Sequence, residues 1–237
     1  KLMKCIISED ISQESYYSLL QFSKDFMFIR KYENLHGGID SHADLQCFPL
    51  EDNVVVVHPE IHPKTIEEAK TIGIDLLYGN TKLEKKYPKD IPYNVAKIGE
   101  NVLHSVEHMD PIVKMELEFR KYNFINVKQG YTKCSVLPLG DHNIITADQG
   151  IAKTIRQSSI DVLLIEGGHI ELPGFNTGFI GGACGVIQEK GIVLFNGDIA
   201  LHPNYIKIHS LLKETGYDYK CLNHGPLTDV GSIFFLP

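Results

Sequence analysis

One stretch of the chain reads Leu45-Gln46-Cys47-Phe48-Pro49-Leu50, Glu51-Asp52-Asn53, Val54-Val55-Val56-Val57, and is followed by Pro63–Ile72 and Ile74-Asp75-Leu76-Leu77. Two apolar runs around a polar turn indicate a β-hairpin. The next segment begins with a proline, which a helix tolerates in its first turn. The last run is β-rich, so the stretch predicts a ββαβ unit.

The same helical element recurs along the chain, each time near a start signal. Its predicted starts lie 51, 47, 38 and 54 residues apart, and a step through the C-terminus back to the first start adds 47. Pro63, Pro111 and Pro203 suit a first turn, and Ser12, Asp110 and Asp148 are N-cap residues. The predicted helices are Ser12–Lys24, Pro63–Ile72, Asp110–Tyr122, Asp148–Ser158 and His202–Thr215.

A β-rich run follows each predicted helix, and a polar turn between two apolar runs comes next, as in Ser135–Thr146. The last unit has only Gly231–Leu236, and its missing partner strand is available as Cys5–Ser8. We therefore predict a single α/β domain over residues 1–237. It is a five-bladed ββαβ propeller with a pseudo-fivefold repeat, whose N- and C-terminal strands close one blade. An ordinary α/β sandwich with coincidental spacing is the alternative.

Composition narrows the function. The chain has 237 residues, 43% of them hydrophobic, and a net charge of -7. Because no basic cluster is present, nucleic acid is not expected as a partner. No apolar run approaches a membrane span, and no signal peptide is expected. The five cysteines are widely spaced, which fits a cytoplasmic protein without disulfides. The sequence predicts no cofactor and does not define an oligomeric state.

Cys134 is the candidate nucleophile. It lies in Gly130–Leu139, between a glycine turn and a short apolar run, where we expect it to face a cavity at a strand start. Fast attack needs the thiolate, so an adjacent cation should lower the pKa of the thiol, and Lys133 is the nearest candidate. The alternative is that Cys134 is a small buried hydrophobic residue.

Several segments resemble the pentein superfamily of guanidino-group-modifying enzymes, with the closest likeness to dimethylarginine dimethylaminohydrolase. Gly130–Leu137 resembles that family's cysteine segment, and Ser41–Phe48 resembles its catalytic-histidine segment. Tyr87–Ala96 resembles the blade between them, and Thr228–Phe235 resembles the acidic-Gly-Gly segment that precedes the histidine. The resemblance implies a propeller in circularly permuted order. The chain also resembles an uncharacterised bacterial family of this fold.

The resemblance implies that Cys134, His42 and Asp229 are catalytic. A histidine can protonate a leaving amine and then activate water. A carboxylate should orient the imidazole, and Asp229 by resemblance or Asp44 by spacing fits this role. On a strand, His42 and Asp44 would point into one cavity, where Asp44 could also hold a substrate cation.

The fourth unit departs from the family pattern. The resemblance puts substrate-holding acidic residues near Gly181-Gly182-Ala183-Cys184, which contains no carboxylate. Free arginine, agmatine and methylated arginines should therefore be poor substrates unless Glu166, Glu171 or Asp229 turns into the cavity. The glycine-rich run Gly174–Gly182 suits tight turns or close approach to a ligand. The candidate substrate-binding residues are Asp44, Glu166, His169, Glu171, Asn94 and Asn176.

Two functions remain open at this level. The first is a cysteine-dependent hydrolase or transferase of a small amidine- or guanidine-like C–N substrate through a covalent thiol intermediate. The second is a non-catalytic pentein-fold binding protein. A metal site is not expected, since the spaced pairs His58/His62 and His104/His108 do not suit helix-borne zinc.

Overall fold

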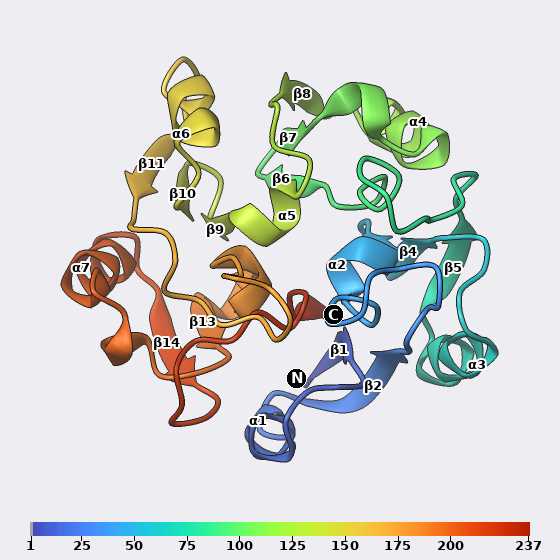
Figure 1. Cartoon of the computed structure of the whole chain (residues 1–237), viewed down its shortest axis with the longest axis horizontal. Helices are drawn as coiled ribbons and strands as arrows, with labels where there is room; N and C mark the ends of the chain where they lie inside the picture. The colour runs from blue at the N-terminus through green and yellow to red at the C-terminus, as the bar shows by residue number, and fades with distance from the viewer. Residues whose placement is uncertain (1) are drawn as a thin grey trace.

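The computed structural model describes residues 2–237, and within them the strands form five separate three-stranded sheets. In Figure 1 these sheets surround a common centre, and the longer helices lie at the outside. The sheets, in strand order, are β15 (Phe234–Leu236), β1 (Met3–Ser8) and β2 (Ser23–Ile29); β3 (Cys47–Pro49), β4 (Val54–Val57) and β5 (Asp75–Tyr78); β6 (Ala96–Ile98), β7 (Asn101–His104) and β8 (Asn123–Asn126); β9 (Leu137–Leu139), β10 (Asn143–Thr146) and β11 (Asp161–Leu164); β12 (Cys184–Ile187), β13 (Ile192–Phe195) and β14 (Asp218–Cys221).

Every sheet has the same topology. Its first two strands pair antiparallel, and its middle strand pairs parallel with the third. A parallel pair needs a crossover, and a helix supplies it in each unit. The helices are α1 (Gln13–Leu19), α3 (Pro63–Ile72), α4 (Pro111–Phe119), α6 (Gln149–Ile155) and α7 (Tyr205–Glu214). The predicted ββαβ unit is thus confirmed.

The predicted start signals begin the helices. The side chains of Ser12, Asp110 and Asp148 each accept a hydrogen bond from a backbone N–H in the first turn. These bonds satisfy donors that the helix cannot pair internally. Pro63 and Pro111 occupy first-turn positions, whereas Pro203 precedes α7, which begins at Tyr205.

The two ends of the chain meet in one sheet, as predicted. β1 pairs antiparallel with β15 in the register Lys4↔Leu236, Cys5↔Phe235 and Ile6↔Phe234. β1 also pairs with β2, so it is the middle strand of its sheet. In the other four sheets a turn connects the two antiparallel strands. In this sheet the antiparallel strands β15 and β1 come from opposite ends of the chain and are held together by backbone pairing.

Apolar side chains of neighbouring sheets pack against each other around the whole ring. One buried cluster of the described residues joins Ile6 of β1 to Val57 of β4, and another joins Phe48 of β3 to Val102 of β7. Similar clusters join the remaining neighbours, including the last sheet and the first. The middle strands are buried on both faces, which explains their continuous apolar sequences.

One expectation about local structure is wrong. The segments before three inner strands are single helical turns: α2 (Ala43–Gln46), α5 (Thr132–Ser135) and the 3-10 turn η2 (Gly181–Ala183). His42 is the N-cap of α2, and Asp44 lies inside that turn. The two residues therefore do not alternate along a strand, and Cys134 lies in a helical turn before β9 rather than at the strand start.

Candidate functional site

A cluster of polar side chains lies where the chain enters the inner strands. Asp44 comes from the turn before β3, Asn94 from the loop before β6, and Cys134 from the turn before β9. Ser232 precedes β15, and the carbonyl of Gly181 lies before β12. Because the inner strands converge at the centre, each unit of the ring contributes to one small volume (Figure 1).

Cys134 is held by two side chains from other units. Its thiol donates to Oδ2 of Asp44 over 3.3 Å, and its sulfur accepts from Nδ2 of Asn94 over 3.2 Å. Asn94 Oδ1 also accepts from the backbone N–H of Lys133 at 2.8 Å, and Asn94 Nδ2 donates to the Asp44 carbonyl at 2.8 Å. Asn94 therefore fixes the sulfur relative to the carboxylate. Only 4% of the Cys134 surface is exposed.

Asp44 is a completely buried carboxylate. Its Oδ2 accepts from the thiol and, at 2.7 Å, from the hydroxyl of Ser232. Its Oδ1 has no hydrogen-bond partner among the described residues. Burial raises the pKa of Asp44, and the nearby Asp229 raises it further, whereas His42 and Lys133 lower it. An unpartnered buried carboxylate oxygen is costly, and a ligand donor would relieve that cost.

His42 and Asp229 form the second half of the cluster. Nδ1 of His42 lies 3.8 Å from Oδ1 of Asp229, within ion-pair distance but longer than a hydrogen bond. Burial lowers the pKa of His42 below 6.5, so its imidazole is neutral at neutral pH. Burial raises the pKa of Asp229 to about 6, although backbone N–H groups of Gly231 and Phe179 donate to its two oxygens over 2.9 and 3.0 Å.

Asp229 occupies the place where the fourth unit lacks a side chain. A Cβ atom on Gly182 would overlap the carboxylate of Asp229, and one on Gly178 would contact its Cβ at 2.5 Å. The glycines at these positions therefore make room for an acidic residue from the C-terminal segment. Of the three acidic residues considered for this role, Asp229 is the one that is turned inward.

The side chain of Lys133 is directed at Ser232 and not at the Cys134 thiol, which its position next to Cys134 had suggested. Its ammonium donates to the hydroxyl of Ser232 at 3.0 Å and contacts the Gly181 carbonyl at 3.5 Å. The pKa of Cys134 is raised well above its ordinary value, first by burial and then by the charges of Asp44 and Asp229. Burial and these two charges therefore favour the protonated thiol over the thiolate. The prediction that Lys133 lowers its pKa is wrong, because the side chain is directed at Ser232.

The structure does not bring the remaining substrate-binding candidates to the cluster. Their side chains are exposed, and among the described residues no side chain of the four forms a hydrogen bond or ion pair with Cys134, His42 or Asp229, although the backbone carbonyl of Glu171 accepts from the N–H of Asp229 at 2.8 Å. His169 and Glu166 lie 3.8 Å apart at the surface. The glycine-rich run instead forms turns, since Gly174 has φ of 86°. The four exposed residues are Glu166, His169, Glu171 and Asn176.

Ser232 is a site residue that the sequence reasoning missed. Its hydroxyl donates to Asp44 at 2.7 Å and accepts from Lys133, and it is fully buried. Its φ is 68°, a conformation that favours glycine. The available signal was its place in Thr228–Phe235, the segment that resembles an acidic-Gly-Gly motif.

Two observations bear on metals and membranes. Among residues 2–237, no group of three or more His, Cys, Asp or Glu side chains is arranged to hold a metal ion. Within the same residues, no helix combines the length and the apolar character needed to cross a bilayer.

Solved structures of similar fold include two of dimethylarginine dimethylaminohydrolase. One is an adduct of a histidine-to-glycine variant with S-methyl-L-thiocitrulline, with a TM-score of 0.53, 8% identity, and coverage of 99% of this chain and 100% of that chain. The other is a cysteine-to-serine variant from Pseudomonas aeruginosa complexed with citrulline, with a TM-score of 0.52, 7% identity and the same coverage. At this identity the likeness shows the fold alone.

A third similar structure is SxtG, an amidinotransferase from Microseira wollei in the saxitoxin biosynthetic pathway. Its TM-score is 0.51 at 12% identity, covering 93% of this chain and 88% of that chain. The comparison with curated protein sequences gives no match. A family model matches residues 6–234, and the chain therefore belongs to the Family of unknown function (DUF6873).

Proposed function

We propose that this protein is a cysteine-dependent hydrolase or transferase of the guanidino-modifying type, acting on a small guanidine- or amidine-like C–N substrate. The observation that carries the proposal is the position of the Cys134 thiol, which is hydrogen-bonded to Asp44 and Asn94 at the centre of the ring. The similar structures are of a dimethylarginine dimethylaminohydrolase, bound to S-methyl-L-thiocitrulline or citrulline, and of an amidinotransferase. We further propose that the five sheets are the blades of a five-bladed propeller.

Two buried carboxylates favour a cationic substrate. Asp44 has an unpartnered oxygen, and Asp229 lies where the fourth unit leaves space. Each charge-assisted hydrogen bond from a guanidinium is worth about 1.5 to 3 kcal/mol. The same carboxylates raise the pKa of Cys134, so a bound cation that offsets their charge lowers that pKa. The substrate therefore helps to generate its own nucleophile.

The residues supply a complete sequence of steps. The sulfur of Cys134 forms a C–S bond at the amidinium carbon, and the thiol proton passes by way of Asp44 to the leaving nitrogen. The C–N bond breaks, a neutral amine departs, and an S-alkylthiouronium cation remains. Water then adds with loss of a proton to the neutral His42. The C–S bond breaks as the hydroxyl proton returns to sulfur, which gives a ureido product. An acceptor amine in place of water gives transfer.

Substrate entry requires movement of the covering segments, because His42, Asp44, Asn94, Cys134 and Asp229 are all at most 5% exposed. One such segment runs through Phe179, whose N–H donates to Asp229. Residues that cover a site and exclude water strengthen the electrostatic interactions inside it. We propose that this cover opens to admit the substrate.

A matched pair of alkylating reagents tests the proposal. 2-Chloroacetamidine is a cation that resembles the substrate, and 2-chloroacetamide is its neutral analogue. At neutral pH we expect the amidine to label Cys134 at least tenfold faster than the amide does, and before any other cysteine, as measured by peptide mass spectrometry. Cys134→Ser should abolish the fast reaction, whereas Cys184→Ser should leave it intact.

Equal rates with the two reagents, or slower labelling of Cys134 than of the other cysteines, would reduce Cys134 to a structural residue. Release of ureido product from a panel of small guanidines, lost in Cys134→Ser and His42→Ala, would establish turnover. Turnover that survives Cys134→Ser would overturn the catalytic assignment.

A non-catalytic binding protein is the second candidate. The observation that favours it is the protonated, sealed thiol, since an activated cysteine usually has a lowered pKa. Such a protein would bind a cation between Asp44 and Asp229 without forming an adduct. Reversible guanidinium binding without any labelling by 2-chloroacetamidine would identify it.

We also propose that the chain is a circular permutation of the order found in the similar enzymes. In the family that the chain resembles, the acidic segment precedes the histidine, whereas here Asp229 follows His42 and Cys134. In a closed ring the two orders give the same neighbours if the chain ends lie between different units. A superposition in which the units match best without any shift would contradict this.

A further inference from the structure

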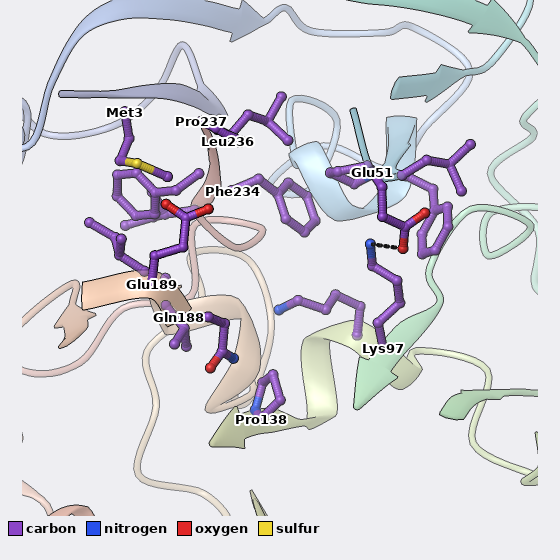
Figure 2. Close-up of a pocket in the computed structure, with 18 of the residues that line it drawn as sticks. Met3, Glu51, Lys97, Pro138, Gln188, Glu189, Phe234, Leu236 and Pro237 are labelled. Carbon is purple, nitrogen blue, oxygen red and sulfur yellow. Dashed lines mark ion pairs between the residues drawn. The ribbon is translucent and has the colours of Figure 1, made fainter. Parts of the chain in front are cut away.

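The ring has a second cavity, open to solvent, which runs along the inner strands to their ends opposite Cys134. Its volume is about 560 Å³, within the range of pockets that hold small organic molecules. Its lining includes residues from every inner strand or from the turn after it. In Figure 2 the labelled side chains of Glu51, Lys97, Gln188, Glu189 and Phe234 surround this opening. We refer to it as the channel.

The walls of the channel are mainly apolar. Leu50, Val95, Val186, Phe234 and Leu236 line it, and they come from four different sheets or their adjoining loops. An apolar molecule that displaces water from such walls gains about 25 cal/mol for each Å² removed from water. The channel therefore suits a ligand with an aliphatic or aromatic body.

Most charges along the channel are already paired or solvated. Lys97 lies 3.8 Å from Oε1 of Glu51, as the dashed line in Figure 2 marks. Glu51 is also paired with Arg120 at 3.0 Å. The other side-chain carboxylates of the lining, Asp52, Asp141 and Glu189, are exposed and keep their hydration. None of these groups therefore needs a charged group of a ligand as its partner.

Lys133 differs from the other charged residues of the channel in having no ionic partner. It lines the channel, and among the residues the structure describes no carboxylate forms an ion pair with it. Its contacts are the Ser232 hydroxyl, the Gly181 carbonyl at 3.5 Å and the ring of Phe234, whose centroid is 5.5 Å away. An ammonium has three donors, and these contacts leave at least one N–H for a further acceptor. An anionic group in the channel would supply that acceptor.

We propose that the channel is a second ligand site, which binds a small molecule with an apolar body and one anionic head group. The head group, a carboxylate or a similar oxyanion, pairs with Lys133, and the body packs along Val95, Val186 and Phe234. This site is separate from the cluster around Cys134, which holds two carboxylates and favours a cation. Lys133 and Ser232 form the boundary between the two.

The test uses 8-anilinonaphthalene-1-sulfonate, an aromatic anion whose fluorescence rises on binding to apolar sites. We expect saturable binding at one site per chain, displaced by decanoate and not by decyltrimethylammonium. Lys133→Met removes the charge but keeps an apolar stem, and it should weaken binding at least tenfold, which corresponds to about 1.4 kcal/mol. Val186→Trp should abolish binding by filling the channel. Inorganic phosphate and sulfate as competitors distinguish a bare oxyanion from an anion with an apolar body.

Lys190→Met is the matched control, because it removes the same charge from an exposed position just beyond the channel lining. It should bind the probe as the unmodified protein does. Thermal unfolding of every variant checks that the fold is retained. Equal binding in Lys133→Met and the unmodified protein, equal displacement by the cationic amphiphile, or saturable binding that persists in Val186→Trp would overturn the proposal. Displacement by phosphate or sulfate alone, with decanoate inactive, would overturn it as well.

Discussion

The segments before the inner strands differ sharply from the segments after them. Before the strands, Asp44, Asn94, Cys134 and Asp229 are buried and in contact or near contact with each other. After the strands, the channel is open to solvent, its walls are apolar, and its rim charges are paired or hydrated. The same five strands thus separate a sealed polar cluster from an open apolar one.

The two regions affect the stability of the fold in opposite ways. Burying the channel-lining residues stabilises the ring through the hydrophobic effect, whereas burying ionisable groups raises or lowers their pKa values and destabilises it. The sealed polar cluster is therefore the region that stability alone does not explain. A strained or costly group of this kind is typical of a functional site.

Both regions depend on closure of the ring, and deleting residues 1–8 should produce the largest effect. The deletion removes β1, the middle strand of its sheet, together with Met3, Cys5, Ile6 and Ile7, which are buried. At about 1.5 to 3 kcal/mol for each large apolar side chain, the loss approaches the whole stability of a domain. We expect no cooperative thermal transition. Deleting residues 1–2 is the control, and unchanged melting after the longer deletion would contradict ring closure.

Asp44→Asn should raise the rate at which Cys134 is alkylated and lower the rate at which a guanidine is turned over. It removes a negative charge that raises the pKa of Cys134, so the thiolate fraction at pH 8 and the rate of alkylation by neutral iodoacetamide should rise about tenfold. Turnover of a guanidine should instead fall by about two powers of ten, because the substrate loses an anionic partner and the thiol loses its proton acceptor.

Ser232→Ala is the control for that experiment, since it removes a hydrogen bond to Asp44 and leaves the charge in place. Its alkylation rate should stay within a few-fold of the rate in the unmodified protein. Slower alkylation in Asp44→Asn would show that Asp44 activates the thiol even without a cation, and that the electrostatic reading of the cluster is wrong.

Asp229 should give the polar cluster a pH-dependent stability. Its pKa rises from an ordinary value of 3.8 to about 6 in the folded protein, so the folded state binds more protons than the unfolded state between these values. The stability that Asp229 contributes is therefore present below about pH 4 and is lost as the pH rises through 6. The full difference corresponds to about 3 kcal/mol.

Asp229→Asn isolates this effect, since the amide does not ionise. Its free energy of unfolding relative to the unmodified protein should increase by up to about 3 kcal/mol from pH 4 to pH 7, whatever the offset caused by its changed contacts with Gly231 and Phe179. Denaturant titrations at several pH values measure it. A difference that stays constant with pH would show that Asp229 has an ordinary pKa.

The smallest expected effect is that of a ligand in the channel on the reactivity of Cys134, which would act through Lys133. An anion in the channel would pair with Lys133 and offset the charge that lowers the pKa values of Asp44 and Asp229. We expect saturating decanoate to change the rate of Cys134 alkylation by 2-chloroacetamidine a few-fold, and to leave that rate unchanged in Lys133→Met. A decanoate effect of equal size in Lys133→Met would mean that the two regions are not linked through this side chain.

The repeat and its closure were predictable because their signals are local. Ser12, Asp110 and Asp148 cap helices wherever they occur in the right sequence context, and alternating apolar runs specify strands without knowledge of their neighbours. The prediction that Gly231–Leu236 pairs with Cys5–Ser8 follows from counting complete units. Asp44 and Asn94 were also predicted from sequence, and they lie beside Cys134.

The sequence by itself determined five similar units, the closure of the ring by the chain ends, and the residue types that gather at its centre. Only the tertiary structure decided which of them touch. A helical turn before β3 rotates successive side chains by about 100° rather than 180°, so Asp44 rather than His42 meets the thiol. Contacts across the ring direct Lys133 to Ser232, place Asp229 against Gly182, and leave Glu166 and Glu171 exposed. Such contacts join residues up to 188 positions apart, and no local pattern encodes them.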